Sequence, residues 1–449
     1  MGVFLLVITQ IGDFTGSRLI WLDPVFKHSQ LGMCEENEIG LQLSLVKRKK
    51  RTSTMNAPLN PAVNEKKLNA KKMHDHILNH LDLFRRNASQ AREERKVPQE
   101  NINILKEAGF FLALQPKEWE GYELDPQDFF RTQMAIAEAC MSTAWAGGII
   151  AVHPFQLALM DRRAQEAVWT ENIHARISSS YAPMGKVEAV DGGFRFSGRW
   201  GWSSGSDHCE WVFLGGICPG EGYRTFLLPS EDYAIVDTWN AMGLQGTGSN
   251  DIVVEDVFVP DYMTHKAEDG FLLTNPGVTA KSAPIYRIPW AQWFVRVVST
   301  PAIGACKEAL SLYKQLILAK ASGDLSKLSG DTSTQERVAA SINDIDEMET
   351  IMFRNFDRMV SQVNAGEDVP LEERIKYRYQ ASLVIDRSME VVDRLFSSAG
   401  GSSVFDGSDI QQRFLDIHTA RAHVANNPTT FGRNLGSTSL GTENTDFFV

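Results

Sequence analysis

The chain has 449 residues, with 45 Lys and Arg against 56 Asp and Glu, and a formal net charge of −11. A hydrophobic share of 43% and a charged share of 22% are ordinary for a globular protein. The acidic balance argues against sequence-independent nucleic-acid binding, which needs a basic surface to displace counterions. None of the five cysteines has C-x-x-C spacing, so the sequence predicts neither a zinc knuckle nor a disulfide framework and favours a reducing cytoplasm.

The first 54 residues differ from the rest in charge. They hold seven Lys and Arg against five Asp and Glu, a balance of +2 that leaves −13 for the remainder. A basic cluster at 47–51 follows the apolar stretch, whereas a secretory signal would place it first. We interpret residues 1–54 as a disordered or upstream extension and Met55 as the biological start. A nuclear address at 47–51 is the alternative.

The hydrophobic period divides the remaining chain into three predicted domains. Residues 55–174 show helical spacing and predict an N-terminal helical domain. Residues 175–287 alternate with a period of two between glycine-rich turns, which predicts an antiparallel sheet or small barrel. Residues 288–449 return to helical spacing and predict a four-helix bundle. The bundle helices are expected at 290–318, 334–363, 371–399 and 409–425.

Common cofactor and metal motifs are absent from the sequence. No G-x-G-x-x-G links a strand to a helix, and neither H-E-x-x-H nor G-x-S-x-G occurs. Residues 246–249 read Gly-Thr-Gly-Ser, but no phosphate-binding lysine follows, so we interpret them as a tight turn. We therefore expect no metal, and a site built from distant segments.

Three features are candidates for such a site: a run of hydroxyls, a segment with two tryptophans, and the placement of the histidines. The hydroxyl run 178–185 could line a polar ligand or form a serine-rich loop. Segment 199–208 sets two tryptophans beside small residues, which suits a flat ring or a strand edge. His153 lies on an apolar helical face and could be a core histidine bonded to the backbone. His418 and His423 are expected on different faces of the final helix, so that only one faces a shared cavity.

Taken together, residues 60–449 resemble the acyl-CoA dehydrogenase architecture, an α+β fold. Where the dehydrogenases carry Thr-Glu-Pro over the flavin, residues 179–183 read Ser-Ser-Tyr-Ala-Pro. Where they carry Lys-x-Trp-Ile-Thr-Asn, residues 199–205 read Arg-Trp-Gly-Trp-Ser-Ser-Gly. These segments resemble the oxygenase component of two-component flavin-dependent aromatic monooxygenases. This group includes the 4-hydroxyphenylacetate 3-hydroxylases and the steroid-degrading 3-hydroxy-9,10-secoandrostatriene-dione hydroxylases.

Four segments are most similar to the steroid branch of that group. They are 177–185, 243–250, 282–290 and 425–428.

The resemblance implies a cytoplasmic homotetramer that receives reduced flavin from a separate NAD(P)H:flavin reductase. The flavin would be FMNH₂, with FADH₂ as the alternative, and O₂ the co-substrate. Through a C4a-hydroperoxyflavin the enzyme would hydroxylate a phenol ortho to its hydroxyl, with no nucleic-acid or membrane partner. The alternative is an acyl-CoA dehydrogenase or an N- or S-oxygenating flavoenzyme of the same fold. A dehydrogenase needs a carboxylate base, for which the C-terminal segment offers Glu443 without a recognisable motif.

The resemblance also assigns site residues. His153 would deprotonate the phenol, Ser204 would lie near flavin N5, and His423 would lie nearer the flavin peroxide. Lys320 stands where the family often has an arginine near the flavin phosphate, and lysine lacks the bidentate fork. The expected flavin-binding residues are Trp145, Ser179, Ser180, Tyr181, Trp202, Ser203, Ser204, Lys320, Gly401, Ser402, His423 and Val424. The aromatic residues Trp290, Trp293 and Phe294 hint at a bulky aromatic substrate.

Overall fold

The computed structural model describes residues 61–321 and 329–449. Residues 58–449 form one compact unit. The predicted extension 1–54 lies outside the described residues, and so does the proposed start at Met55. The domain boundaries expected at 174 and 287 stay predictions. No helix in the described ranges is both long and apolar enough to cross a membrane.

The N-terminal part is helical, as the spacing predicts, and its central helix is α6 (Met141–Leu159). Every residue of α6 is buried, because the helix is apolar on all sides. It packs against β1 (Ile177–Val190) on one side and against α5 (Pro126–Ala139), α9 (Trp290–Val297) and α10 (Thr300–Ala321) on others. The other helices of this part are α1 (Pro61–Leu78), α2 (Leu81–Arg86), α3 (Ala88–Glu94), α4 (Gln99–Glu107), α5 (Pro126–Ala139) and α7 (Arg162–Trp169).

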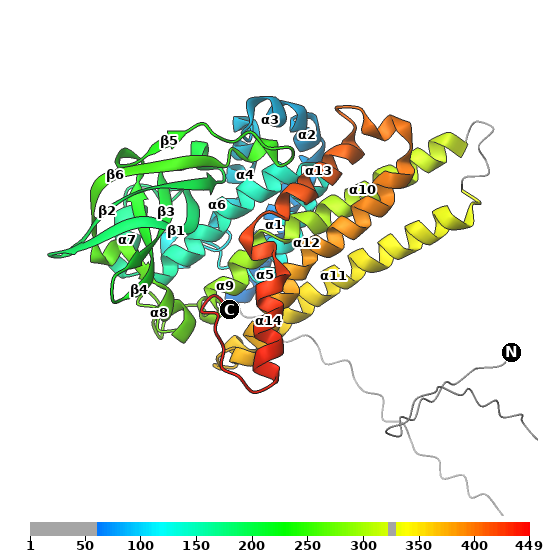
Figure 1. Ribbon diagram of the computed structural model, residues 1–449. Coiled ribbons are helices and arrows are strands. Elements are labelled where there is room, and N and C mark those ends of the chain that lie inside the picture. Colours follow the sequence, from blue (N-terminus) through cyan, green and yellow to red (C-terminus); the bar gives the residue numbers. More distant parts are fainter. Residues whose placement is uncertain (1–60, 322–328) are drawn as a thin grey trace, which may run out of the picture. The chain divides into compact units, whose positions relative to one another are not determined.

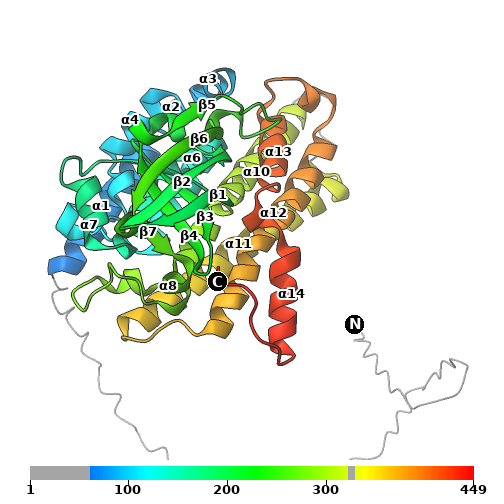
Figure 2. The same cartoon turned by 60° about the vertical axis from the view of Figure 1, so that its left-hand side comes forward.

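The middle of the chain forms one seven-stranded sheet in the order β5-β6-β2-β1-β3-β4-β7 (Figure 2). Its strands are β1 (Ile177–Val190), β2 (Gly193–Ser203), β3 (Trp211–Cys218), β4 (Gly222–Pro229), β5 (Ala234–Val236), β6 (Asn250–Pro260) and β7 (Thr264–Lys266).

The expectation of a purely antiparallel sheet is wrong for one strand pair. The second half of β1 forms an antiparallel hairpin with β2, but its first half pairs in parallel with β3. The chain turns after β2 through Gly205, which has a φ of 74°, so that β3 runs in the direction of β1. A shift of register between Ser180 and Gly185 interrupts the ladder at Tyr181. The sheet is therefore mixed. The alternation of apolar and polar residues predicts that a segment is a strand, but not whether the neighbouring strand runs parallel or antiparallel to it.

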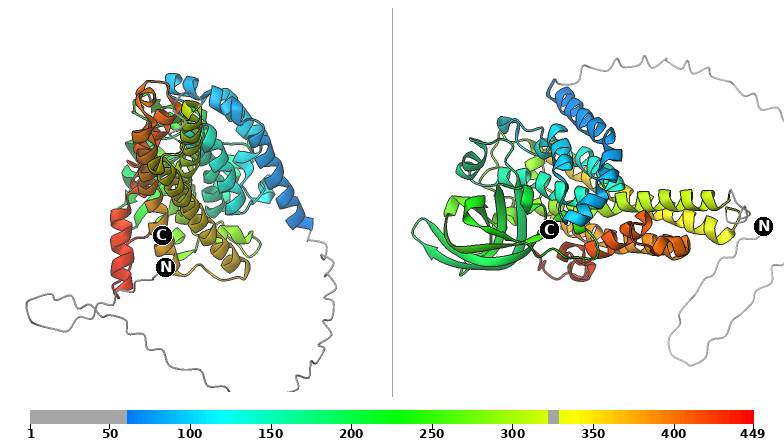
Figure 3. Two further views of the ribbon diagram at one scale, coloured as in Figure 1. Left: turned by 90° about the vertical axis from the view of Figure 1, so that its right-hand side faces the viewer. Right: turned by 90° about the horizontal axis from the view of Figure 1, so that it is seen from above.

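The last part contains long helices, of which α10, α11 (Thr332–Asn364) and α12 (Leu371–Ala399) lie side by side away from the sheet (Figures 1 and 3). A small helix α8 (Ala267–Leu272) precedes them at the end of the β region. The helices of the last part are α9 (Trp290–Val297), α10 (Thr300–Ala321), α11 (Thr332–Asn364), α12 (Leu371–Ala399), α13 (Asp409–Ala420) and α14 (Pro428–Ser439).

Two of the expected bundle helices differ from the structure. The helix expected at 290–318 is broken into α9 and α10, because Pro301 lacks an N–H and its ring clashes with the preceding turn. The helix expected at 409–425 ends at Ala420, whose carbonyl accepts the Asn426 side-chain amide at 2.9 Å. As a result, His423 lies outside the helix, contrary to expectation, and α14 follows it.

Candidate active site

His153 projects from α6 toward the first residue of β1. Its Nδ1 donates to the Ile177 carbonyl at 2.6 Å, and the side chain is fully buried. Burial lowers the pKa of His153 to about 3, against the opposing effect of the Ile177 hydrogen bond. The ring is therefore neutral at neutral pH, with its proton on Nδ1 and an acceptor lone pair on Nε2. That Nε2 is buried and has no partner among the residues that the structure describes.

Aromatic rings surround His153. Its ring centroid lies 5.5 Å from Phe213, 6.2 Å from Tyr181 and 6.3 Å from Trp290. Phe294 adds an edge contact to Tyr181, with centroids 4.8 Å apart. These side chains come from α6, β1, β3 and α9, so the walls form only when helical and sheet regions pack together. The arrangement suits a flat apolar ring next to one unsatisfied acceptor.

Tyr181 is held by a residue that the sequence reasoning missed. Its phenol donates to Oε1 of Gln156, which lies three residues after His153 and so on the same face of α6. Burial raises the pKa of Tyr181 well above its usual value, which keeps the phenol protonated. The helical spacing from His153 was the available signal for Gln156.

Ser204 stands at the start of a chain of buried hydroxyls. Trp145 Nε1 donates to Ser204 Oγ at 3.2 Å, and Ser204 Oγ lies 2.8 Å from Ser249 Oγ. Ser249 Oγ lies 2.7 Å from Thr247 Oγ1, which donates to the Leu244 carbonyl at 2.9 Å. The Gly-Thr-Gly-Ser segment is the tight turn that the sequence predicts, but its hydroxyls also contact a candidate site residue.

His423 also contacts Trp145, edge to face. Its ring centroid is 5.8 Å from that of Trp145 and 6.1 Å from that of Phe294. Nδ1 accepts the Ala425 N–H at 3.2 Å, so the proton of the neutral ring is on Nε2. Burial, followed by the positive charge of Arg378, lowers the pKa of His423 to about 4. The free ring nitrogen of His423 is thus a donor, whereas that of His153 is an acceptor.

Of the two C-terminal histidines, His423 reaches this cluster and His418 does not, although the expected reason, different faces of one helix, is wrong because His423 lies outside α13. His418 Nε2 instead lies 2.8 Å from a carboxylate oxygen of Asp393, and its ring packs against Phe414.

Ser179 and Ser180 lie near the start of β1, and Trp202 and Ser203 lie at the end of β2. Ser180 donates to the Gly201 carbonyl at 2.7 Å, and Ser179 is buried nearby. Ser203 is fully buried, and its hydroxyl has no partner in the described part of the chain. Trp202 has a φ of 67°, which a bulky side chain seldom adopts, and its indole is 69% exposed. This strained backbone presents a flat aromatic face beside buried hydroxyls.

The remaining expected residues lie elsewhere. Gly401 and Ser402 are exposed in the turn after α12, and Val424 is 78% exposed. Among the described residues, no hydrogen bond or ring contact joins these three to His153. Lys320 belongs to the last turn of α10, and its side chain lies outside the described part.

The C-terminus adds a contact that the sequence did not indicate. The Phe448 ring centroid lies 6.1 Å from that of Phe294, and the buried Arg374 donates to the Val449 carbonyl at 3.3 Å. Glu443, the one carboxylate considered for dehydrogenase chemistry, is exposed.

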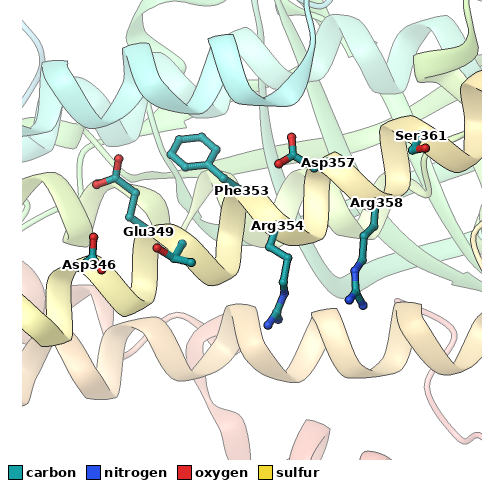
Figure 4. A pocket seen from close by; sticks show the side chains of 8 residues that line it. Asp346, Glu349, Phe353, Arg354, Asp357, Arg358 and Ser361 are labelled. Carbon is teal, nitrogen blue, oxygen red and sulfur yellow. The ribbon is translucent and has the colours of Figure 1, made fainter. Parts of the chain in front are cut away.

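A separate groove follows α11 and is lined by charged residues (Figure 4). Arg354 and Arg358 extend from α11 toward α12, and Arg354 donates to Gln380 of that helix at 3.4 Å. None of the expected site residues lines this groove.

Comparison with known proteins decides the family. The model of the acyl-CoA dehydrogenase C-terminal domain matches residues 296–428. The flavin-dependent monooxygenase oxygenase subunit HsaA of Rhodococcus jostii is 37% identical over 377 residues, which are 82% of this chain and 98% of that protein. This chain belongs to the same family of flavin-dependent monooxygenase oxygenase subunits.

Further relatives agree with that family. The p-hydroxyphenylacetate 3-hydroxylase oxygenase component of Acinetobacter baumannii is 30% identical over 375 residues, or 81% of this chain and 87% of that protein. The crystal structure of the 3-HSA hydroxylase from Rhodococcus sp. RHA1 superposes with a TM-score of 0.82 at 37% identity, covering 84% and 99% of the two chains. This oxygenase subunit is therefore an enzyme of the two-component, flavin-dependent aromatic hydroxylases, which work with a separate reductase.

Proposed function

We propose that this oxygenase subunit hydroxylates a phenol ortho to its hydroxyl, and that His153 Nε2 accepts the phenolic proton. The supporting observation is the buried Nε2 of a neutral imidazole among aromatic rings, which has no partner in the part of the chain that the structure describes. An unpartnered buried acceptor is costly, so a ligand O–H that satisfies it gains a strong hydrogen bond. The Ile177 carbonyl fixes the tautomer, because it accepts the Nδ1 proton.

His153 is a weak base, and its low pKa defines its role. In the ground state it only accepts a hydrogen bond from the phenol, since full transfer would bury an imidazolium. As the ring attacks the electrophilic oxygen, electron density leaves the phenol oxygen and its O–H becomes more acidic, so the proton can move to Nε2. Aromatic side chains around this position exclude water and keep the interaction strong.

The residues around Trp145 fit a flavin. A reduced flavin bound there would supply the activated oxygen. Ser204, Ser203 and the exposed indole of Trp202 offer polar groups and a flat surface for the isoalloxazine ring, with Ser204 next to N5. The Nε2–H of His423 would donate to the oxygen being transferred.

We propose FMN as the preferred flavin, with Lys320 near its phosphate. Lysine lacks the bidentate fork of arginine, but its single positive charge can still neutralise a compact phosphate such as that of FMN. Gly401, Ser402 and Val424 would contact the flavin of a neighbouring subunit in a homotetramer, which their exposure permits.

The proposed substrate is a phenol with a large apolar substituent, of the steroid-derived class. Support comes from the extended wall of Phe213, Trp290 and Phe294, and from the 37% identity to the 3-HSA hydroxylase. We place the enzyme in the cytoplasm. The four cysteines in the described part are unpaired, as in reducing compartments.

The test is the His153→Ala variant. It should still bind and oxidise reduced FMN, but release hydrogen peroxide in place of hydroxylated phenol. The matched control is His418→Ala, which removes a histidine outside the aromatic cluster. Hydroxylation retained in His153→Ala, or lost equally in both variants, would contradict the assigned role.

A further inference from the structure

Ser204 contacts a chain of hydroxyls whose proton positions are fixed by its two ends. At one end, Trp145 Nε1 can only donate, and it donates to Ser204. At the other end, the Leu244 carbonyl can only accept, and Thr247 Oγ1 donates to it. Between them, Ser249 lies within hydrogen-bond distance of both Ser204 and Thr247.

Each hydroxyl has one proton, and one assignment satisfies every contact. The Thr247 proton is used on the Leu244 carbonyl, so Ser249 must donate to Thr247. The Ser249 proton is then used, so Ser204 must donate to Ser249. The three hydroxyl residues are at most 6% exposed, so water does not compete for these hydrogen bonds and their directions are kept. Because its only proton points to Ser249, the Ser204 hydroxyl can accept a further hydrogen bond but cannot donate one.

The turn at residues 244–247, which contains the accepting end of the chain, is held in place by a residue of α13. Leu244 has a φ of 50°, and its N–H is held by the buried Asp416 carboxylate at 2.6 Å. Its carbonyl also accepts the Trp239 indole N–H at 2.9 Å, and Gly205 N–H donates to the Thr247 carbonyl at 2.9 Å. These contacts keep the accepting end of the chain in place.

We propose that Ser249 and Thr247 are positioning residues that select the reduced flavin. This inference rests on the proposed function, in which Ser204 faces flavin N5. Reduced flavin carries a proton on N5 and can donate to Ser204, whereas oxidised flavin has only a lone pair there. Because the Ser204 proton is directed toward Ser249, the site favours N5–H and opposes bare N5. An oxygenase subunit supplied by a separate reductase benefits from retaining the reduced form and releasing the oxidised one.

The test compares the dissociation constants of oxidised and anaerobically reduced FMN in the wild type and in variants. Ser249→Ala or Thr247→Val frees the Ser204 proton to donate to oxidised N5. Gaining or losing one neutral hydrogen bond changes a dissociation constant by about five- to tenfold. The ratio of the dissociation constant of oxidised FMN to that of reduced FMN should therefore fall by that factor in these variants. A tenfold change equals about 30 mV in the two-electron potential of the bound flavin. Thr247→Ser keeps the hydroxyl and should keep the wild-type ratio.

Ser206→Ala is the matched control. Ser206 is buried in the segment that follows Ser204, but its hydroxyl has no partner in the described ranges and is not part of the chain. Its loss should leave the ratio unchanged. Thermal unfolding of each variant establishes that it is folded, and a ratio of constants is insensitive to the fraction of active protein.

The outcomes separate the two proposals. If the wild type binds no reduced flavin, the proposed function fails and this inference with it. If the wild type binds reduced FMN and hydroxylates a phenol, but Ser249→Ala and Thr247→Val keep the ratio, only the role of the hydroxyl chain is overturned. A fall of the same size in Ser206→Ala would also overturn it.

Discussion

The neutral state of His153 makes the stability of the fold depend on pH in a predictable way. In the unfolded chain the ring titrates near its ordinary pKa of 6.5, whereas burial lowers the pKa in the folded protein to about 3. Between these values the unfolded state binds a proton that the folded state does not. The free energy of unfolding therefore falls as the pH falls through this window, and is unaffected by His153 above it.

The magnitude follows from the two pKa values. From about pH 7 to about pH 5 the unfolded ring takes up nearly one proton and the folded ring almost none, which lowers the free energy of unfolding by about 2 kcal/mol. His153→Leu abolishes this term. We therefore expect the wild type to lose about 2 kcal/mol more than the variant over that interval.

The assay is urea unfolding of the flavin-free protein at both pH values and one protein concentration, since oligomerisation links stability to concentration. His174→Leu, at an exposed position, controls for the loss of a histidine. Equal losses in the wild type and His153→Leu would refute the reasoning, because His153 would then not be held neutral in the folded protein.

Two further changes test the packing around the site. Tyr181→Phe leaves Gln156 Oε1 without its donor and should lower the free energy of unfolding by about 1 kcal/mol, measured by urea unfolding. Gly243→Ala places a Cβ 2.2 Å from the Leu415 carbonyl oxygen, so the turn must move off α13, and we expect a loss of about 2 kcal/mol and weaker binding of reduced FMN. Gly436→Ala, where a Cβ meets nothing within 4 Å inside α14, is the control and should be neutral or stabilising. An equal loss in both glycine variants would contradict the account of Gly243.

The sequence predicted the fold where local signals agree with the tertiary structure. The helix expected at 371–399 is α12, because Pro370 precedes it and Gly400, with a φ of 89°, ends it. The hydrophobic period alone predicts one helix across Pro301, because apolar residues continue on both sides of the break between α9 and α10. The parallel pairing of β1 with β3 depends on the turn at Gly205, which no strand pattern records.

The candidate site was predicted in part, through the resemblance of its segments to a family. His153 and Tyr181, both assigned by that resemblance, lie together in a cluster closed by α9, and their roles stay predictions. Ser249 and Thr247 were missed because their role depends on the left-handed Leu244 and on a carboxylate from α13, 172 residues away. Such long-range anchoring has no signature in the local sequence.

The central claim is that this chain inserts one oxygen atom of O₂ into a phenol with reduced flavin. The direct measurement is mass spectrometry of the product after single turnover with reduced FMN, ¹⁸O₂ and a steroid-derived phenol. We predict one ¹⁸O atom ortho to the original hydroxyl in the wild type, and unmodified phenol with hydrogen peroxide in His153→Ala. Complete conversion of O₂ to peroxide by the wild type, or product oxygen that comes from water, would contradict the account.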